Sequence, residues 1–193
     1  MFNHSSRQSF LSVALLIGLM FPIGCKDNST NSVPQISTNQ IVPLKVGNQW
    51  NLTVNSYDSS NVLQSGNISI MILRDTVIAG QRWYEMPIHL LCQNDSIGLT
   101  IYSESSNQLM FKYPAKVGEV YFNYGDTVTV VNVDTLITVP AGTFKCYQYH
   151  YKSNSSWFIS PGVGFIKYEA TKLSNANTLM VYYWETLSSI ILK

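Results

Sequence analysis

The sequence predicts an all-β protein, an antiparallel and strongly curved sheet or half-barrel with little helix outside an N-terminal leader. Three observations predict this fold. After Cys25, no run of residues shows the 3.6-residue apolar period and the caps of a helix. Apolar and aromatic runs of strand length alternate instead with corners rich in Pro, Gly, Asn and Asp. Some of these runs are apolar on both faces, so they need cover from a second sheet layer, from curling of their own sheet or from a bound apolar ligand.

Residues 1–24 have the pattern of a secretory signal peptide. Arg7 and the terminal amine precede an apolar run that is too short to span a bilayer. Gly24-Cys25 follows at once and resembles the lipobox of bacterial lipoproteins, although Pro22 stands where that family usually has Leu. The resemblance implies that Cys25 is acylated and becomes the mature N-terminus, which anchors the protein to a membrane through lipid. An ordinary secretion signal is the alternative.

The residues after the leader predict a location and a tether. Lys26-Asp27-Asn28 resembles the export tag that sends some Bacteroidota lipoproteins to the cell surface. The expected location is therefore the bacterial outer membrane, with either a periplasmic or a surface orientation. Residues 25–40 combine the acylated cysteine with a polar tract that has little to bury, so we expect a flexible tether. Residues 41–193 are long enough for a single β domain.

The charge balance excludes one class of partner. Removal of residues 1–24 takes away Arg7 and no acid, and this leaves eleven basic and eleven acidic side chains. The formal net charge is then near zero, and no Lys/Arg cluster is present. Nucleic-acid binding requires such clusters to neutralise phosphate, so we expect no nucleic-acid partner.

Within residues 41–193 the strand signals follow one another with turns between them. Trp50, Leu52 and Val54 alternate with polar residues and predict the first half-buried strand. Further strands are expected at 68–75, 81–92, 97–103, 109–113, 127–133, 135–139, 144–152, 157–159 and 179–187. The pattern P-x-K-V-G-x-x-aromatic occurs at 43–50 and again at 114–121, which indicates that one kind of turn is used twice. Duplication of a half-domain is the less favoured explanation.

The corner motifs resemble those of a known group of proteins. They are the opening Pro43-Leu44-Lys45-Val46-Gly47, the VPAGTF corner at 139–144 and the PGVG-aliphatic-Lys strand at 161–167. With these motifs the chain resembles uncharacterised secreted or lipid-anchored proteins of Bacteroidota type. More loosely, it is similar to the curved half-barrels of lipoprotein carriers, which hold acyl chains on an apolar concave face. The resemblance implies a fold and a compartment, and no binding residue is carried over from it.

The cysteines and histidines give no metal or catalytic signature. Cys92 and Cys146 remain after Cys25, and in an oxidising compartment they are either a disulfide pair or two free buried thiols. His89 and His150 have no paired His, Cys or HExxH context, so no metal ligand set and no cofactor are expected. No nucleophile elbow is present, and we expect a non-enzymatic protein. A hydrolytic alternative requires at least two titratable groups that converge in one pocket.

The aromatic side chains are the feature that we expect to carry function. The candidate ligand-binding residues are Trp50, Tyr147, Tyr149, Tyr151, Trp157, Tyr182 and Trp184. Many of them are explained by β-propensity and core packing alone. The functional hypothesis is that a stripe of them lines a concave face and binds an acyl chain or another apolar small molecule. The alternative is a binding module whose exposed aromatics contact a glycan or a partner protein.

Overall fold

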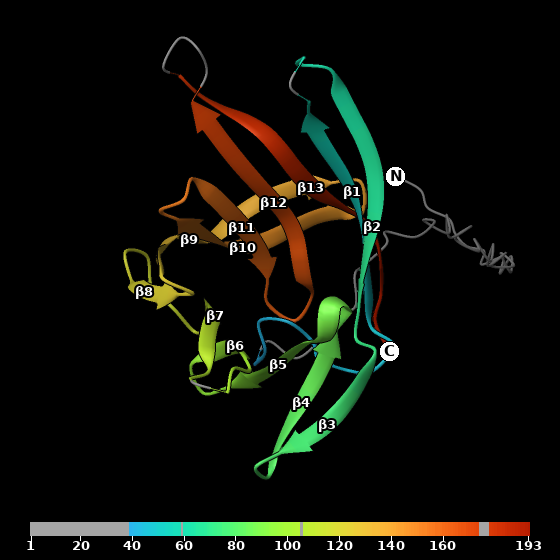
Figure 1. Ribbon diagram of the computed structural model, residues 1–193, viewed down its shortest axis with the longest axis vertical. Coiled ribbons are helices and arrows are strands. Elements are labelled where there is room, and N and C mark those ends of the chain that lie inside the picture. The colour runs from blue at the N-terminus through green and yellow to red at the C-terminus, as the bar shows by residue number, and fades with distance from the viewer. Residues whose placement is uncertain (1–38, 59, 105, 174–177) are drawn as a thin grey trace, which may run out of the picture. The chain divides into compact units, whose positions relative to one another are not determined.

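The computed structural model describes residues 39–58, 60–104, 106–173 and 178–193. The predicted signal peptide and most of the predicted tether, Cys25 included, lie outside these residues. In the described part of the chain the only helical element is a single 3-10 turn at Pro87–His89, and the strands belong to two antiparallel sheets (Figure 1). The predicted all-β antiparallel class is therefore confirmed.

The first sheet has eight strands in the order β2-β1-β13-β12-β11-β10-β9-β8. They are β1 (Gln49–Tyr57), β2 (Leu63–Met71), β8 (Val120–Asn123), β9 (Asp126–Val139), β10 (Gly142–Tyr151), β11 (Ser155–Ser160), β12 (Gly164–Leu173) and β13 (Leu179–Ile191). Strands β8 to β13 form a meander, and β13 then pairs with β1, where Leu187 lies opposite Leu52. The second and third strands of the sheet are thus the first and the last strands of the described residues.

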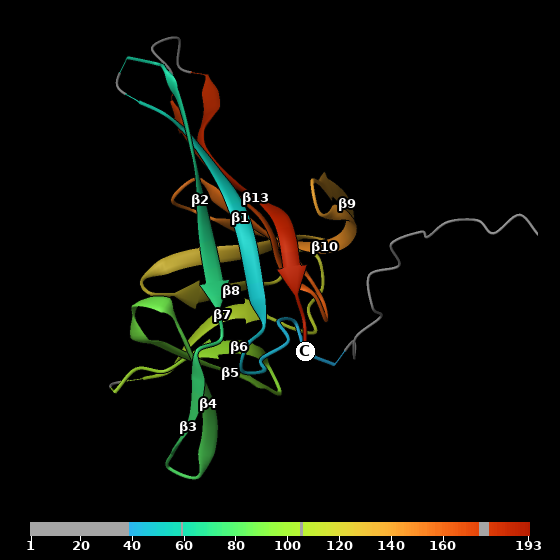
Figure 2. The ribbon, with the colours of Figure 1, turned by 90° about the vertical axis from the view of Figure 1, so that its right-hand side faces the viewer.

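The second sheet is a five-stranded meander in the order β3-β4-β5-β6-β7. Its strands are β3 (Arg74–Ile78), β4 (Gln81–Met86), β5 (Leu90–Asp95), β6 (Gly98–Ile101) and β7 (Gln108–Lys112). The chain enters this sheet directly after β2 and leaves it before β8. Figures 1 and 2 both show it, in green, at the lower end of the first sheet.

The first sheet is strongly curved, as predicted. The corner between β9 and β10 reaches β13, where the Ala141 N–H donates a hydrogen bond of 3.1 Å to the Leu187 carbonyl. In the order of the sheet β11 and β12 stand between β10 and β13, and in a flat sheet those outer strands would be roughly 14 Å apart. Register shifts in the β9–β10 and β11–β12 pairs supply the bends. The sheet therefore curls until the β9–β10 corner contacts β13 of the same sheet.

Strand β10 has buried residues on both faces, because each face has a different cover. Tyr149 pairs with Trp157 of β11, and both rings face Phe111 of the second sheet. The alternate residues Phe144 and Cys146 lie on the other face and are also buried. The sequence predicts three possible covers for strands that are apolar on both faces. Two of them, a second sheet layer and curling of the same sheet, are present.

The repeated motif forms the same turn twice. Gly47 and Gly118 both have φ +87°, a left-handed conformation that favours glycine. The Gly47 N–H donates to the Ile72 carbonyl, and the Ile72 N–H donates back to the Asn48 carbonyl. The second copy has the equivalent pair of bonds between Gly118, Val130 and Glu119. Shared turn chemistry accounts for the recurrence.

The possible disulfide between Cys92 and Cys146 is not present. Both cysteines are free and buried, and they belong to β5 and β10, which lie in different sheets. Burial raises the pKa of each thiol to about 12. Spacing along the chain does not show which sheet a cysteine joins, so the sequence left the pairing open. Both thiols act as small apolar core side chains.

Candidate functional site

Most of the predicted aromatic stripe is packed against the chain itself. The Phe111 ring lies 5.1 Å from the Tyr149 ring and 5.8 Å from the Trp157 ring, measured between centroids. Tyr149 is fully buried, and its hydroxyl donates to the Lys112 carbonyl at 2.7 Å. The Phe111 side chain thus packs on the aromatic face, at the position where an acyl-chain ligand was expected.

The neighbouring predicted residues have partners of their own. Trp50 is fully buried and donates from Nε1 to the Val163 carbonyl at 2.7 Å. Tyr147 packs edge-on against Tyr113, with 5.4 Å between the ring centroids. The Tyr151 hydroxyl donates to a backbone carbonyl of β7 at 3.3 Å. A ligand on this face would have to displace side chains of the protein.

The last two predicted aromatics lie on β13, apart from this core. Trp184 pairs with Glu169 of β12, and its ring centroid is 5.8 Å from that of Tyr57. Together with Lys167 and Val181, these three residues line an open hollow of about 310 Å³, the Trp184 groove. Tyr182 has the Lys172 ammonium 5.3 Å above its ring. The seven predicted residues therefore do not form one site.

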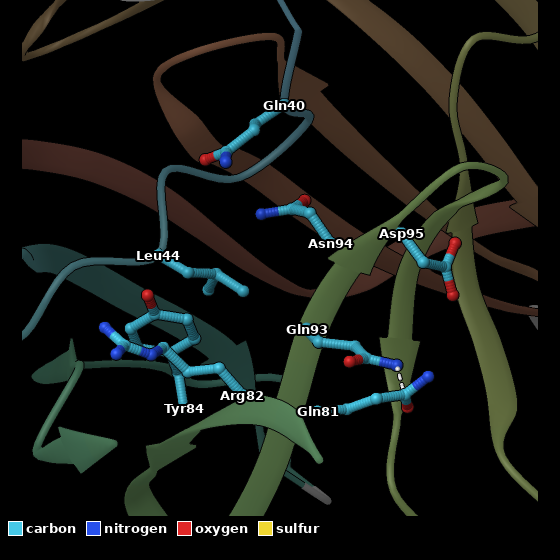
Figure 3. A pocket seen from close by; sticks show the side chains of 8 residues that line it. All are labelled: Gln40, Leu44, Gln81, Arg82, Tyr84, Gln93, Asn94 and Asp95. Carbon is cyan, nitrogen blue, oxygen red and sulfur yellow. Dashed lines mark hydrogen bonds between the residues drawn. The ribbon is translucent and has the colours of Figure 1, made fainter. Parts of the chain in front are cut away.

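A polar pocket of about 420 Å³ lies between the segment before β1 and strands β4 and β5 (Figure 3). Sequence reasoning missed it. It is lined by Gln40, Leu44, Gln81, Arg82, Tyr84, Gln93, Asn94 and Asp95. Amide side chains reach it from three separate segments, and no spacing along the chain indicates that they meet.

The wall formed by the segment before β1 is held by specific bonds. The Gly162 N–H donates to the Gln40 carbonyl at 2.8 Å, and Asn94 Nδ2 donates to the Val42 carbonyl at 2.8 Å. Ile41 and Val42 are fully buried between these two bonds. Residues 40–44 are therefore a fixed part of the fold, and Gln40 is positioned by backbone bonds on one side of the pocket.

Some polar groups of the pocket are used in hydrogen bonds within the fold, and others are free to bind a ligand. Both Asp95 oxygens are used in the β5–β6 turn, where they accept bonds from two backbone N–H groups and from the Thr100 hydroxyl at 2.6 Å. Asn94 Oδ1 is buried without a hydrogen-bond partner among the described residues. Gln93 and Gln81 make one bond of 3.3 Å to each other, which leaves further amide donors and acceptors open. The Arg82 guanidinium makes a long ion pair of 3.5 Å with Asp75.

A second polar cluster, the Glu85 cluster, lies on the β3–β4 hairpin and the 3-10 turn that follows it. Glu85 is buried, accepts a hydrogen bond from Arg74 Nε and has His89 Nδ1 2.7 Å from its other oxygen. These two partners hold the pKa of Glu85 below its usual range. Ile88 and His89 both have φ near +60°, an unusual conformation for side chains of this size. Titratable groups do converge here, in an arrangement that neutralises a buried carboxylate.

The Glu85 cluster gives a pH-dependent prediction. The pKa of Glu85 is lower in the folded than in the unfolded protein, so the carboxylate adds stability above its ordinary pKa of 4.5 and loses it as the pH falls through the folded-state pKa. Above about pH 5, Glu85→Gln is therefore expected to be less stable than the wild type, and the difference should shrink on acidification. Urea unfolding at a series of pH values checks this. A constant difference from pH 7 to pH 3 would contradict it.

Within the described residues no three His, Cys, Asp or Glu side chains lie close enough together to hold a metal ion. The same part of the chain has no helix that combines the length and the hydropathy needed to cross a membrane.

Comparisons with known proteins add one structural similarity. No protein-family model matches the chain, and no curated protein matches it. Among solved structures it is similar to a candidate exported protein with a YMCC-like fold from Bacteroides fragilis, with 10% sequence identity and a TM-score of 0.48. The match covers 78% of this chain and 98% of the other. At this TM-score no role is transferred from that protein.

Proposed function

We propose that this chain is a non-enzymatic, lipid-anchored protein of the bacterial outer membrane that binds a saccharide in the polar pocket. The leader and Cys25 support the anchor, since a signal-peptide pattern ends at a cysteine. The polar pocket supports the ligand. The core supports a non-enzymatic role, because the aromatic face is filled by the protein itself and the Glu85 carboxylate is already bound by Arg74 and His89.

The observation that carries the ligand class is the donor and acceptor set of the pocket. Gln40, Gln81 and Gln93 offer amides that both donate and accept, which suits hydroxyl groups that do the same. Tyr84 adds an aromatic ring and a hydroxyl, and Arg82 adds a cation at the rim. A purely apolar ligand would leave these groups without partners at a cost of about 1–3 kcal/mol each where they are buried.

Glycan-array binding of the full-length protein tests the ligand. We expect Tyr84→Ala or Gln93→Leu to weaken binding about tenfold, because each removes about 1–1.5 kcal/mol of contact. Tyr124→Ala, 60% exposed in the turn between β8 and β9 and outside the pocket lining, is the matched control and should bind as the wild type does. Equal binding by wild type and pocket variants would place the site elsewhere. If the array retains no glycan at all, the proposal of a saccharide ligand is wrong.

The anchor has a separate test. Cells that express the full chain are labelled with a palmitate analogue, and wild type is compared with Cys25→Ala. Label on the wild type alone is the expected result. Equal label on both proteins would end the lipoprotein assignment without bearing on the pocket.

An apolar or acyl-chain ligand is the second candidate, favoured by the Trp184 groove. Trp184, Tyr57 and Val181 line that open hollow, whereas the other aromatic face is occupied by Phe111. If this candidate holds, the full-length protein takes up a fluorescent fatty acid to saturation, and Trp184→Ser weakens the uptake. Tyr149→Ser serves as the comparison, since it alters the core and not the groove.

A further inference from the structure

The two sheets have four edge strands, and three of them are protected. β3 has five residues and begins with Arg74 and Asp75, and β8 has only four residues. β7 is covered by side chains, because Asn123, Tyr121 and Tyr149 donate to carbonyl groups along it. Short length, charge and cover are the usual means by which proteins prevent edge pairing.

Strand β2, the fourth edge, has none of these protections. Its nine residues, LQSGNISIM, contain no charged residue and no proline. Its pairing with β1 runs from Leu63 to Met71 without a register shift, so no bulge twists the edge away. In the part of the chain that the structure describes, no other strand and no side chain bonds to its outer backbone edge. Figure 1 shows β2 at the right-hand margin of the first sheet.

The side chains of β2 leave the outer edge open to a partner. The Ser65 hydroxyl donates to Asn55 at 2.7 Å, and the Ser69 hydroxyl donates to Asn51 at 2.6 Å. These bonds direct both serines toward β1. Ile68, on the other face, is 41% exposed and has apolar surface to bury. The edge thus combines free backbone groups with an apolar side chain that is not yet covered.

We propose that β2 pairs with β2 of a second copy of this chain, antiparallel about a two-fold axis at Asn67. A two-fold contact brings each edge against itself, so a charged edge repels its copy, whereas this strand carries no charge. Centring the pair on Asn67, the middle residue, aligns all nine residues. Gly66 then lies opposite Ile68 of the second copy and leaves room for it, and Ser65 lies opposite Ser69. The two first sheets become one continuous sheet across the dimer.

Thiol cross-linking in cells that express the full chain tests this interface. Cysteine is introduced singly at Gly66, Asn67 or Ile68, and a short bismaleimide is added. The two-fold axis brings equivalent central residues to about 5 Å, so Asn67→Cys should give the strongest dimer band. The parent chain should give none, because Cys92 and Cys146 are buried and acylation would block the thiol of Cys25. Thr76→Cys on β3 is the matched control at another edge and should stay monomeric.

Gly66→Lys separates loss of the dimer from loss of the fold. A side-chain Cβ at Gly66 meets nothing within 4 Å, and its φ lies outside the left-handed region, so the lysine is accommodated. In the Asn67→Cys background this change should reduce the dimer band at least tenfold, because each lysine occupies the space that Ile68 of the second copy needs and the two like charges lie diagonally across the axis. Unfolding should occur at the same or a slightly higher urea concentration. No band at any of the three positions, equal cross-linking at Thr76→Cys, or a band that Gly66→Lys leaves unchanged would each overturn the proposal.

Discussion

Replacing Phe111 with alanine is expected to lower the free energy of unfolding by about 3–5 kcal/mol. Phe111 is fully buried, and its ring lies 5.1, 5.8 and 6.3 Å from the rings of Tyr149, Trp157 and Phe165. It is the side chain of the second sheet around which the aromatic residues of the first sheet pack. Its removal takes apolar area out of the core and leaves a cavity that rigid strands cannot close.

Urea unfolding followed by tryptophan fluorescence measures the effect of Phe111→Ala. Phe122→Ala is the matched control, since Phe122 is 73% exposed on β8 and its loss should change stability by less than about 0.5 kcal/mol. The cavity is apolar, so benzene should raise the melting temperature of Phe111→Ala and not that of the wild type. A loss below about 1 kcal/mol would show that Phe111 does not join the two sheets.

Gly98→Ala is expected to be at least as damaging, at about 4 kcal/mol or more. Gly98 has φ +140°, which side chains rarely adopt, and an added Cβ would lie only 2.0 Å from the Phe111 carbonyl oxygen. It would also lie 2.8 Å from the Tyr113 nitrogen. Both are backbone atoms of β7 and the residue after it, so relief of the clash requires β6 and β7 to separate.

Gly66→Ala provides the contrast for Gly98→Ala. Nothing lies within 4 Å of a Cβ at Gly66, and no unusual φ holds it, so alanine should be neutral or stabilise the strand by roughly 0.5 kcal/mol. Thermal and urea unfolding of the two variants side by side check the difference. Similar stabilities for the two would mean that β6 and β7 are not held as closely as the structure shows.

The sequence predicted those features of the fold that depend on the local alternation of apolar and polar residues. Trp50, Leu52 and Val54 do lie on one face of β1, and the corner at 139–144 does join two long strands. The run expected at 68–75 is two strands, because the chain changes sheets at Ile72 and Leu73. Met71, Ile72 and Leu73 do interrupt the alternation here, but three consecutive apolar residues are equally compatible with one buried strand, so the local pattern does not show that the chain changes sheets.

The site was less predictable, because it depends on contacts between distant segments. The aromatic residues of β10 were predicted as candidate site residues. Their partner Phe111 was not, because in its own strand it is one apolar residue among several. The polar pocket joins amides from three segments, and each amide alone resembles an ordinary surface residue. The left-handed Ile88 was also unpredictable, because β-branched residues disfavour that conformation.

The pairing of β1 with β13 has a consequence for how the chain reaches this fold. The Asn51 side chain donates to the Ser189 hydroxyl across 138 positions of sequence. In synthesis or export that runs from the N-terminus, β1 emerges well before β13, so the seam between them has no second half until β13 follows. The β3–β7 meander, whose pairings are all between sequence neighbours, has no such delay and is free to form first.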